Sequence, residues 1–222
     1  MVVMRSYGEA CGIAHALDLV GERWALLIVR ELLLGPKRFA DLRVGLAHCS
    51  SRILTQRLRD LEHAAVVRRR KLPPPAASWV YELTDRGREL EPVLLALGNW
   101  GVRSPLLDSA GAVSASSVML SLKMYFNPKT SGWKADYELR FGEDRWSVQV
   151  AGDRIEVTSG PAHQADAIIE TSPRTLAALL RSGRLDEAVT AGDLSITGDV
   201  PAVRRLINAI AIPKPLAVAT GS

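Results

Sequence analysis

The sequence has few cysteines, no long apolar run and no signal peptide. Two cysteines, Cys11 and Cys49, in 222 residues are too few for a disulfide framework. A membrane-spanning helix needs roughly 18 uncharged residues, and the longest apolar stretch, WALLIVRELLL, is interrupted by Arg30 and Glu31. The N-terminus lacks the basic, apolar and small-residue order of a secretion signal. These absences predict a cytoplasmic protein with no membrane span.

Enzyme and metal motifs are also absent. The sequence contains no G-x-S-x-G, H-E-x-x-H, P-loop or G-x-G-x-x-G pattern. Cys11 and His15 together with His48 and Cys49 supply two cysteines and two histidines. A structural zinc site needs ligand pairs that are two to five residues apart, however, and His48 is adjacent to Cys49. We therefore predict no enzyme, no metal site and no cofactor.

Basic charge is concentrated in one short segment. Residues 1–105 hold 16 Lys and Arg against 11 Asp and Glu, whereas residues 106–222 hold 12 against 13. Residues 52–71 alone contain seven basic and two acidic residues, and they end on the run RRRK at 68–71. A local basic excess of this kind is the electrostatic signature of a site for a polyanion.

The first half has the pattern of three short helices followed by a hairpin. Helical spacing of apolar residues is found over three ranges, 15–35, 38–46 and 50–65. Ser50 or Ser51 can cap the third helix, because a serine oxygen accepts a free backbone N–H of the first turn. VVRRRKL and SWVYELT surround a PPPAA turn and predict a β-hairpin, and Thr84-Asp85 begins a further helix. This order is typical of a winged helix-turn-helix domain.

The second half predicts a domain of helices layered on one sheet. Residues 116–126 have a helical pattern, and five strand segments follow, of which the clearest alternates Tyr137, Leu139 and Phe141 with charged residues. The overall fold class is therefore α+β, with a mostly five-stranded sheet in the second domain. The small, polar segment between the halves is predicted as a linker. The expected divisions are 1–105, a linker at 106–115, a second domain at 116–213 and a tail at 214–222.

The helix at 51–63 is the candidate DNA reader. Its leucines face a core, which leaves Arg52, Thr55, Gln56 and Arg59 on the other side. Arginine can pair with guanine acceptors, glutamine with adenine, and threonine supplies a hydroxyl or methyl contact. Phosphate contacts, which position the protein without specifying a sequence, are expected from Ser51, Arg57, Arg69, Arg70 and Lys71. A charged helix side is often only solvated, but the basic run at 68–71 beside this helix favours DNA.

Three stretches of the first half carry a family resemblance: CGIAHALDLVGERWALLIVRELLLGPKRFADLR, ILTQRLRDLE and YELTDRGREL. They resemble the HxlR-type winged-helix transcription regulators over about residues 9–103. The resemblance implies a homodimer that uses the N-terminal helix and the Thr84–Gly101 helices. It also implies that the two Ser51–His63 helices are presented to a palindromic operator.

Two positions depart from the family pattern. The family usually has glycine where this chain has Ala65, and alanine in a left-handed turn costs roughly 1–2 kcal/mol, so the turn can be reshaped. The family also usually carries a basic residue where this chain has Ser78. The departure removes a basic side chain from that wing arm, and Arg69, Arg70 and Lys71 are the residues available to replace it.

The segment ADAIIETSPRTLAALLRSGRLDEAVTAGDLSITGDVPAVRRLINAI resembles the sterol carrier protein type two-like fold, which would extend over roughly 116–213. That fold typically encloses an apolar tunnel. The alternative for each candidate lining residue is plain core packing. The candidates are Met119, Leu122, Met124, Tyr125, Phe126, Trp133 and Trp146.

Cys11 is a candidate redox sensor, because some relatives of this type sense electrophiles or oxidants through an N-terminal cysteine. A reactive thiol needs a lowered pKa, and Cys49 directly precedes a helix N-terminus, which can lower one. The alternative for both cysteines is a small apolar residue.

The sequence as a whole predicts a homodimeric transcription regulator that binds double-stranded DNA. Its second domain would bind an apolar small molecule or lipid. The alternative is a lipid-carrier or enzyme-accessory protein whose first half serves only for dimerisation. Salt-sensitive binding to duplex DNA distinguishes the two.

Overall fold

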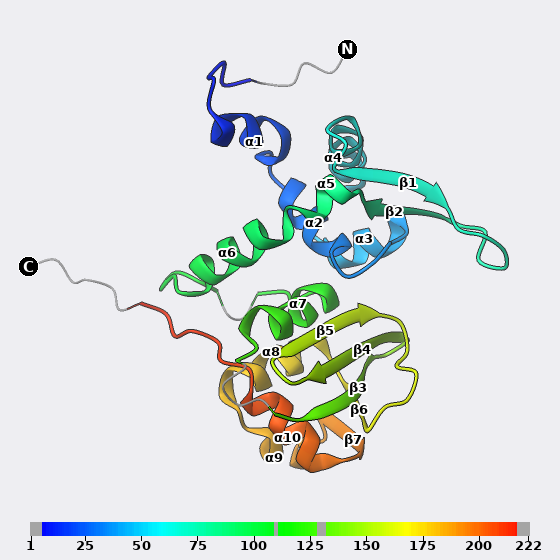
Figure 1. Cartoon of the computed structure of the whole chain (residues 1–222), viewed down its shortest axis with the longest axis vertical. Coiled ribbons are helices and arrows are strands. Elements are labelled where there is room, and N and C mark those ends of the chain that lie inside the picture. Colours follow the sequence, from blue (N-terminus) through cyan, green and yellow to red (C-terminus); the bar gives the residue numbers. More distant parts are fainter. Residues whose placement is uncertain (1–5, 109–110, 128–131, 217–222) are drawn as a thin grey trace, which may run out of the picture. The chain divides into compact units, whose positions relative to one another are not determined.

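The computed structural model describes residues 6–108, 111–127 and 132–216. The chain forms two compact units, residues 1–95 and 96–222, and Figure 1 labels their helices and strands. The predicted linker at 106–115 and tail at 214–222 each include residues outside the described ranges, so these boundaries stay predictions. None of the described helices is long and apolar enough to cross a membrane.

Four helices open the first unit, where the sequence pattern predicted three. The helices are α1 (Gly12–Val20), α2 (Ala25–Leu32), α3 (Phe39–Gly45) and α4 (Ser51–His63). The prediction of one helix through 15–35 is wrong. The break has a local cause, because α1 ends before Gly21 and Trp24 adopts left-handed backbone with φ of 80°. A right-handed helix cannot continue through such a residue.

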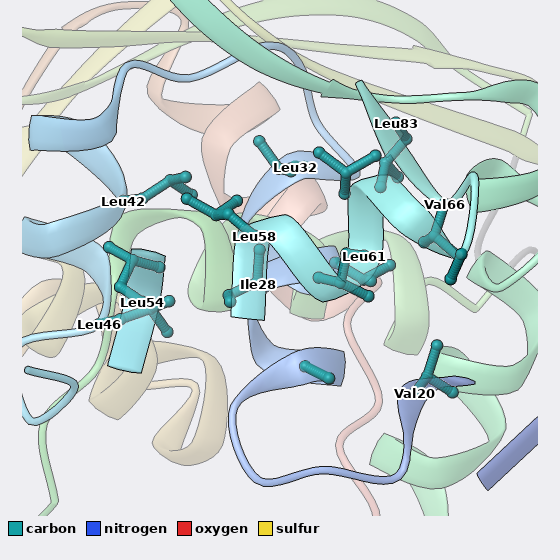
Figure 2. Packing of buried hydrophobic residues seen from close by; sticks show 14 of the residues in the cluster. Val20, Ile28, Leu32, Leu42, Leu46, Leu54, Leu58, Leu61, Val66 and Leu83 are labelled. Carbon is teal, nitrogen blue, oxygen red and sulfur yellow. The ribbon is translucent and has the colours of Figure 1, made fainter. Parts of the chain in front are cut away.

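One side of α4 is committed to the core of the first unit. Ser50 caps the helix, its Oγ accepting a hydrogen bond from the backbone N of Ile53 at 3.3 Å. Leu54, Leu58 and Leu61 are buried, as the leucine spacing predicted. Figure 2 shows the residues around them, which include Ile28, Leu32, Leu42, Leu46, Val66 and Leu83. Because the leucines fix the rotation of α4 about its axis, its opposite side faces outward.

A two-stranded hairpin follows α4, as predicted. Strands β1 (Val67–Lys71) and β2 (Trp79–Leu83) pair antiparallel, with Arg69 opposite Tyr81 and Lys71 opposite Trp79. Lys37 extends this pairing, because its backbone N donates to Tyr81 O at 2.9 Å and its O accepts from Tyr81 N at 2.8 Å. The next helices are α5 (Asp85–Arg88) and α6 (Glu91–Val102). This order of helices and hairpin confirms the winged helix-turn-helix fold.

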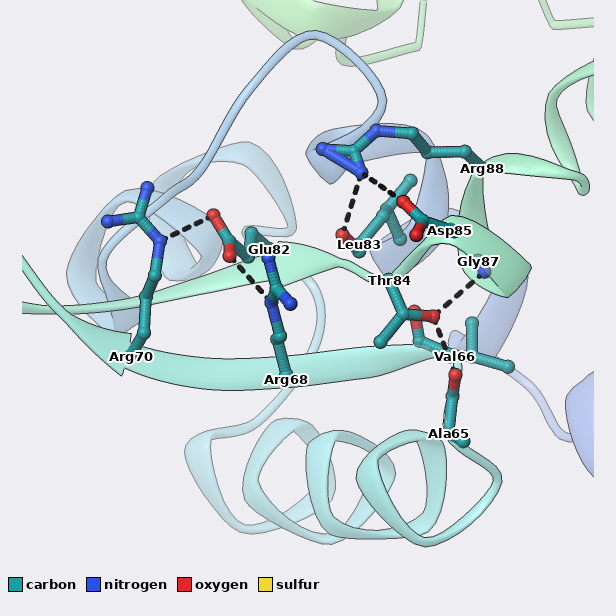
Figure 3. A network of polar contacts seen from close by, with 10 residues as sticks. All are labelled: Ala65, Val66, Arg68, Arg70, Glu82, Leu83, Thr84, Asp85, Gly87 and Arg88. Atoms are coloured by element: carbon teal, nitrogen blue, oxygen red, sulfur yellow. Dashed lines mark hydrogen bonds and ion pairs between the residues drawn. The ribbon is translucent and has the colours of Figure 1, made fainter.

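The turn between α4 and β1 holds its alanine in left-handed backbone. Ala65 adopts the left-handed conformation with φ of 56°. The hydroxyl of Thr84 donates to Ala65 O at 2.6 Å (Figure 3), and the backbone N of Val66 donates to Leu61 O at 2.9 Å. These bonds hold the turn in a conformation that glycine would adopt without strain.

Replacing Ala65 with glycine should therefore stabilise the first unit. Relief of the left-handed alanine is worth roughly 1–2 kcal/mol, and the extra backbone entropy of an unfolded glycine offsets roughly 0.5–1 kcal/mol of this. We expect the free energy of unfolding in urea to rise by about 0.5–1 kcal/mol. Ala64, with φ of −75°, is the matched control, and Ala64→Gly should lower stability. A lower unfolding midpoint for Ala65→Gly would refute this interpretation of the turn.

The second unit is a five-stranded sheet with helices, as the sequence predicted. Its sheet order is β5-β4-β3-β6-β7, in which β3 and β6 run parallel and every other pair runs antiparallel. Its strands are β3 (Lys134–Phe141), β4 (Asp144–Ala151), β5 (Arg154–Ser159), β6 (Ala167–Thr171) and β7 (Leu194–Gly198). The last part of α6 belongs to this unit, and its other helices are α7 (Ala115–Tyr125), α8 (Pro173–Ser182), α9 (Leu185–Thr190) and α10 (Val200–Asn208).

The core of this unit lies between one side of the sheet and the helices. Figure 1 shows α7, α8 and α10 grouped beside the sheet. Alternate residues of the strands are buried on that side, namely Tyr137, Leu139, Trp146, Val148 and Ile169. This alternation follows from the two-residue period of a strand, so the sequence pattern could show it.

Candidate nucleic-acid interface

The outward side of α4 presents polar and basic side chains to solvent. Arg52, Arg59 and His63 are exposed there, and Gln56 is half-buried between them. Ser51 and Thr55 lie half-buried on the flank of the helix, where the Thr55 hydroxyl donates to Ser51 O at 2.8 Å. The threonine oxygen and methyl group are left for an outside partner. The structure thus brings the candidate base-reading residues together on one helix.

Arg57 lies apart from this outward set. Its Nη1 donates to Asp60 Oδ2 at 2.7 Å, and its Nη2 lies 3.4 Å from Glu22 Oε2. Asp60 also accepts a hydrogen bond from Gln56 Nε2, at 2.8 Å. Asp60 was not predicted as part of the site, although its spacing of three and four residues from Arg57 and Gln56 is the spacing at which helical side chains meet.

The basic run of β1 is divided between the two sides of the hairpin. Arg69 stacks on aromatic rings, with its guanidinium carbon 4.6 Å from the Trp79 ring centre and 6.0 Å from that of Tyr81. Such stacking holds a guanidinium in place and leaves its edge N–H groups available. Lys71 is exposed at the end of the strand.

Arg68 and Arg70 share one carboxylate on the other side of the hairpin (Figure 3). Each donates its Nε to Glu82, at 2.7 Å in both cases, and the Glu82 side chain is only 7% exposed. Burial raises the pKa of the Glu82 carboxyl, but hydrogen bonds from Arg70 and Arg68 outweigh this effect and hold the pKa below its usual value. The carboxylate therefore stabilises the fold at neutral pH, and this contribution is lost as the pH falls through the lowered pKa.

The role of Glu82 was not predicted from the sequence, because it depends on strand register. It lies directly opposite Arg68 in the hairpin and diagonal to Arg70, and cross-strand pairs of this kind follow only once the register is known. Each arginine uses its Nε for the carboxylate. The terminal guanidinium nitrogens of both arginines can therefore donate hydrogen bonds to a phosphate oxygen.

A second buried carboxylate fixes the base of the hairpin. Glu31 is fully buried in α2, and its two oxygens accept hydrogen bonds from Arg30 and Lys37, each at 2.7 Å. Lys37 is also the residue whose backbone pairs with Tyr81. The ion pair therefore ties the position of β2 to the helical core. The sequence pattern shows Glu31 only as a charge that interrupts an apolar run.

The two cysteines differ in their surroundings. Cys11 is exposed directly before α1, and interaction with the backbone N–H groups of Ala14 and Ile13 lowers the pKa of its thiol. Cys49 is buried, and this burial raises the pKa of its thiol, which the nearby charge of Arg57 only partly opposes. The interpretation as a small apolar residue therefore suits Cys49, whereas Cys11 is open to solvent.

The seven candidate lining residues of the second unit lie in or at the edge of its core. Met119, Leu122 and Trp146 are buried, and the other four are half-buried. Trp133 meets Phe126 edge to face, with ring centres 6.2 Å apart, and donates its Nε1 to the Tyr137 hydroxyl at 3.1 Å. The Nε1 of Trp146 is buried and has no hydrogen-bond partner. The group is thus mainly apolar and carries one unmatched donor.

A winged helix with an outward basic helix and a basic hairpin defines a class of DNA-binding regulators. Residues 19–105 match the HxlR-like helix-turn-helix family, and residues 128–211 match the SCP-2 sterol transfer family. The chain belongs to the HxlR-like helix-turn-helix family, and it is a DNA-binding transcriptional regulator with a sterol-carrier-like second domain.

Its relatives are named as transcriptional regulators and not as enzymes. An uncharacterized HTH-type transcriptional regulator of Synechocystis is 40% identical over 94 residues, which are 42% of this chain and 70% of the relative. The regulator YodB of Bacillus subtilis is 35% identical over 38% of this chain and 76% of its own length. A crystal structure of quinone-bound YodB aligns with a TM-score of 0.36 and 31% identity, over 40% of this chain and 93% of that one.

Proposed function

We propose that the protein is a cytoplasmic, homodimeric regulator that binds a palindromic DNA operator through α4 and the β1–β2 hairpin. The observation that carries this proposal is the outward side of α4, where Arg52 and Arg59 flank Gln56 beside a basic hairpin. An α-helix fits the major groove, where each base pair has its own pattern of donors and acceptors. The hairpin arginines suit the adjacent phosphates, which position the protein on the duplex.

The residues divide into two roles. Arg52, Thr55, Gln56 and Arg59 read base edges, and Ser51, Arg69, Arg70 and Lys71 hold phosphates. Arg57, assigned to phosphate from the sequence, has its guanidinium engaged by Asp60 and Glu22 and is 22% exposed. For Arg57 we propose support of the reading side of α4 in place of a phosphate contact.

A homodimer is supported by apolar surface on α6 and α1. Val93, Leu97 and Trp100 recur at helical spacing on α6 and are exposed, and Ile13 and Leu17 are exposed on α1. Such stripes are normally buried, and a two-fold partner presents the same surface in return. Two α4 helices related by a two-fold axis would then meet two half-sites of opposite orientation.

Selection of bound duplexes from a random pool tests this proposal. The full-length protein should enrich a palindrome with half-sites about one helical turn apart, or a multiple of that spacing. Binding of the enriched duplex should weaken steeply with salt, because each phosphate contact releases counterions. If no sequence is enriched and binding is independent of salt, the proposal fails. The first unit would then serve only for dimerisation.

The second unit is proposed as a sensor of an apolar ligand. The match to a sterol transfer family and the apolar group around Met119, Trp133 and Trp146 support this role. A ligand can shift DNA affinity only if it binds the two arrangements of the dimer with different affinity.

Reciprocal coupling between ligand and operator is the expected result. Long-chain acyl and sterol-like compounds should change the fluorescence of Trp133 and Trp146. Operator DNA should change the affinity of the protein for such a compound, and the compound should change the affinity of the protein for operator DNA by the same factor. That factor is expected to be about 5–150-fold. Trp133→Phe and Trp146→Phe assign the signal. Binding without coupling would make the second unit a passenger. If no apolar compound binds, the seven residues are ordinary core.

Cys11 is proposed as a site that responds to electrophiles. Its thiolate adds to an electrophilic carbon, as in a maleimide, forming an S–C bond while the neighbouring carbon takes a proton from water. We expect N-ethylmaleimide to alkylate Cys11 at least roughly tenfold faster than Cys49 at neutral pH, because only Cys11 is exposed and its thiol pKa is lowered. Alkylation should change DNA binding in the wild type and not in Cys11→Ser. An equal response in both proteins would exclude Cys11.

A further inference from the structure

A chain of polar contacts runs across the first unit and ends at the reading side of α4. Gln56 Nε2 donates to Asp60 Oδ1 at 2.8 Å, and Arg57 Nη1 donates to Asp60 Oδ2 at 2.7 Å. Glu22, before α2, completes the chain at 3.4 Å from Arg57. Both oxygens of Asp60 are therefore engaged, one by each of two residues of the same helix.

The chemistry of Asp60 fixes which way round the Gln56 amide lies. An ionised carboxylate has only acceptors, so it must face the amide NH2 and not the amide oxygen. The Asp60 side chain is 17% exposed and that of Arg57 is 22% exposed, so both lie mostly within the fold. The Gln56 amide is left with one N–H donor and its Oε1 acceptor for an outside partner.

A donor beside an acceptor on the Gln56 amide matches the major-groove edge of adenine. In the major groove adenine presents the N7 acceptor beside the N6 amino donor, and glutamine pairs with both at once. An amide turned by 180° would present its donor and acceptor in the reverse order. We propose that Asp60 is a positioning residue that sets a preference for adenine at the base facing Gln56. Arg57 and Glu22 hold Asp60 in place.

This inference rests on the proposed insertion of α4 in the major groove. It adds a specificity-determining residue that would not touch DNA. Without Asp60 the amide would sample both orientations and several rotamers, and the pairing with adenine would need ordering at the moment of binding. The expected effect of losing Asp60 is therefore a relaxed base preference, and not a uniform loss of affinity.

The test uses the full-length protein and the duplex enriched by selection. Single adenines are replaced with 7-deazaadenine, which lacks the N7 acceptor, or with purine, which lacks the 6-amino group. At one adenine of each half-site both replacements should weaken wild-type binding by roughly 5- to 100-fold, as for a lost bidentate pair. In Asp60→Asn, whose amide can face Gln56 either way round, the effect should fall to about twofold or less.

Glu62→Gln is the matched control, because it removes one negative charge from the same helix outside the network. It should raise affinity for all duplexes alike and keep the wild-type response to the two base analogues. Asp60→Ala, which offers Gln56 no partner, is the second variant. Circular dichroism melting ensures that all proteins are compared fully folded. The proposal is supported if both Asp60 variants relax the preference for adenine and Glu62→Gln keeps it.

Gln56→Ala separates the two possible failures. If Gln56→Ala removes the response to the analogues while Asp60→Asn and Asp60→Ala keep it, the role of Asp60 is overturned and α4 remains the reader. If no adenine responds in the wild type, the role of Asp60 is overturned as well. If the response survives in Gln56→Ala, Gln56 does not face that adenine and the role of Asp60 is overturned, whereas the proposed interface fails only if no duplex sequence is preferred at all.

Discussion

Trp100→Glu is expected to separate the proposed homodimer into monomers and to lower the affinity for a two-half-site operator by about a hundredfold or more. Trp100 is 71% exposed on α6, on one stripe with Leu97 at 47% and Val93 at 52%. A two-fold interface would bury this stripe twice, so each substitution counts twice. A glutamate there must lose its hydration without gaining a partner. The monomer would retain one half-site and lose the gain from linked binding.

Sedimentation at micromolar concentration and binding to one-site and two-site duplexes measure this effect together. Asn99→Glu is the matched control, because it adds the same charge at the neighbouring exposed position of α6, off the apolar stripe. The control should remain dimeric. A Trp100→Glu protein that sediments like the wild type would show that α6 is not the dimer contact, whatever its effect on DNA.

The second large effect is expected from the hairpin. The triple change Arg69→Ala, Arg70→Ala and Lys71→Ala should lower affinity for every duplex by about a hundredfold at physiological salt, at roughly 1 kcal/mol for each charged contact. The slope of log affinity against log salt should become shallower by about 2.7, since each phosphate contact contributes about 0.9. The ratio of affinities for operator and unrelated duplex should remain nearly unchanged, because phosphate contacts carry no sequence information.

Arg154→Ala, Arg174→Ala and Arg181→Ala form the control for this triple change. These residues are exposed in the second unit, and their removal changes the net charge by the same amount. Titration of both triple variants over a range of salt concentrations separates a local contact from a general loss of positive charge. Equal salt slopes in the two variants would contradict a role of the hairpin at the phosphates.

Periodic patterns predicted most of the fold. The spacing of Leu54, Leu58 and Leu61 predicted both α4 and its buried side, because a helix repeats every 3.6 residues. The alternation of Tyr137, Leu139 and Phe141 predicted β3 in the same way. The break between α1 and α2 was not predicted, since the left-handed residue there is a tryptophan, which has no preference for that conformation. The parallel pairing of β3 with β6 was not predicted either, because it depends on the connection between distant segments.

The sequence predicted which residues form the candidate interface better than it predicted the contacts that those residues make. Arg52, Arg59 and Lys71 are as exposed as the charge pattern indicated. The partners of the other basic residues depend on register and tertiary packing. Glu82 faces Arg68 and Arg70 only through the pairing of β1 with β2. Glu22 reaches Arg57 only through the packing of the first helices against α4. The charge pattern therefore predicted the basic surface but not the carboxylates that bind and orient its arginines.

The outward side of α4 is proposed to read base sequence. The most direct test is the ratio of affinities for the selected operator and for a scrambled duplex of equal length, measured in parallel for the wild type and for Arg52→Ala/Arg59→Ala. Two lost arginine–guanine pairs are worth roughly 1–3 kcal/mol each, so the ratio should fall by about a hundredfold while binding to the scrambled duplex weakens far less. A ratio that equals the wild-type value would contradict the claim.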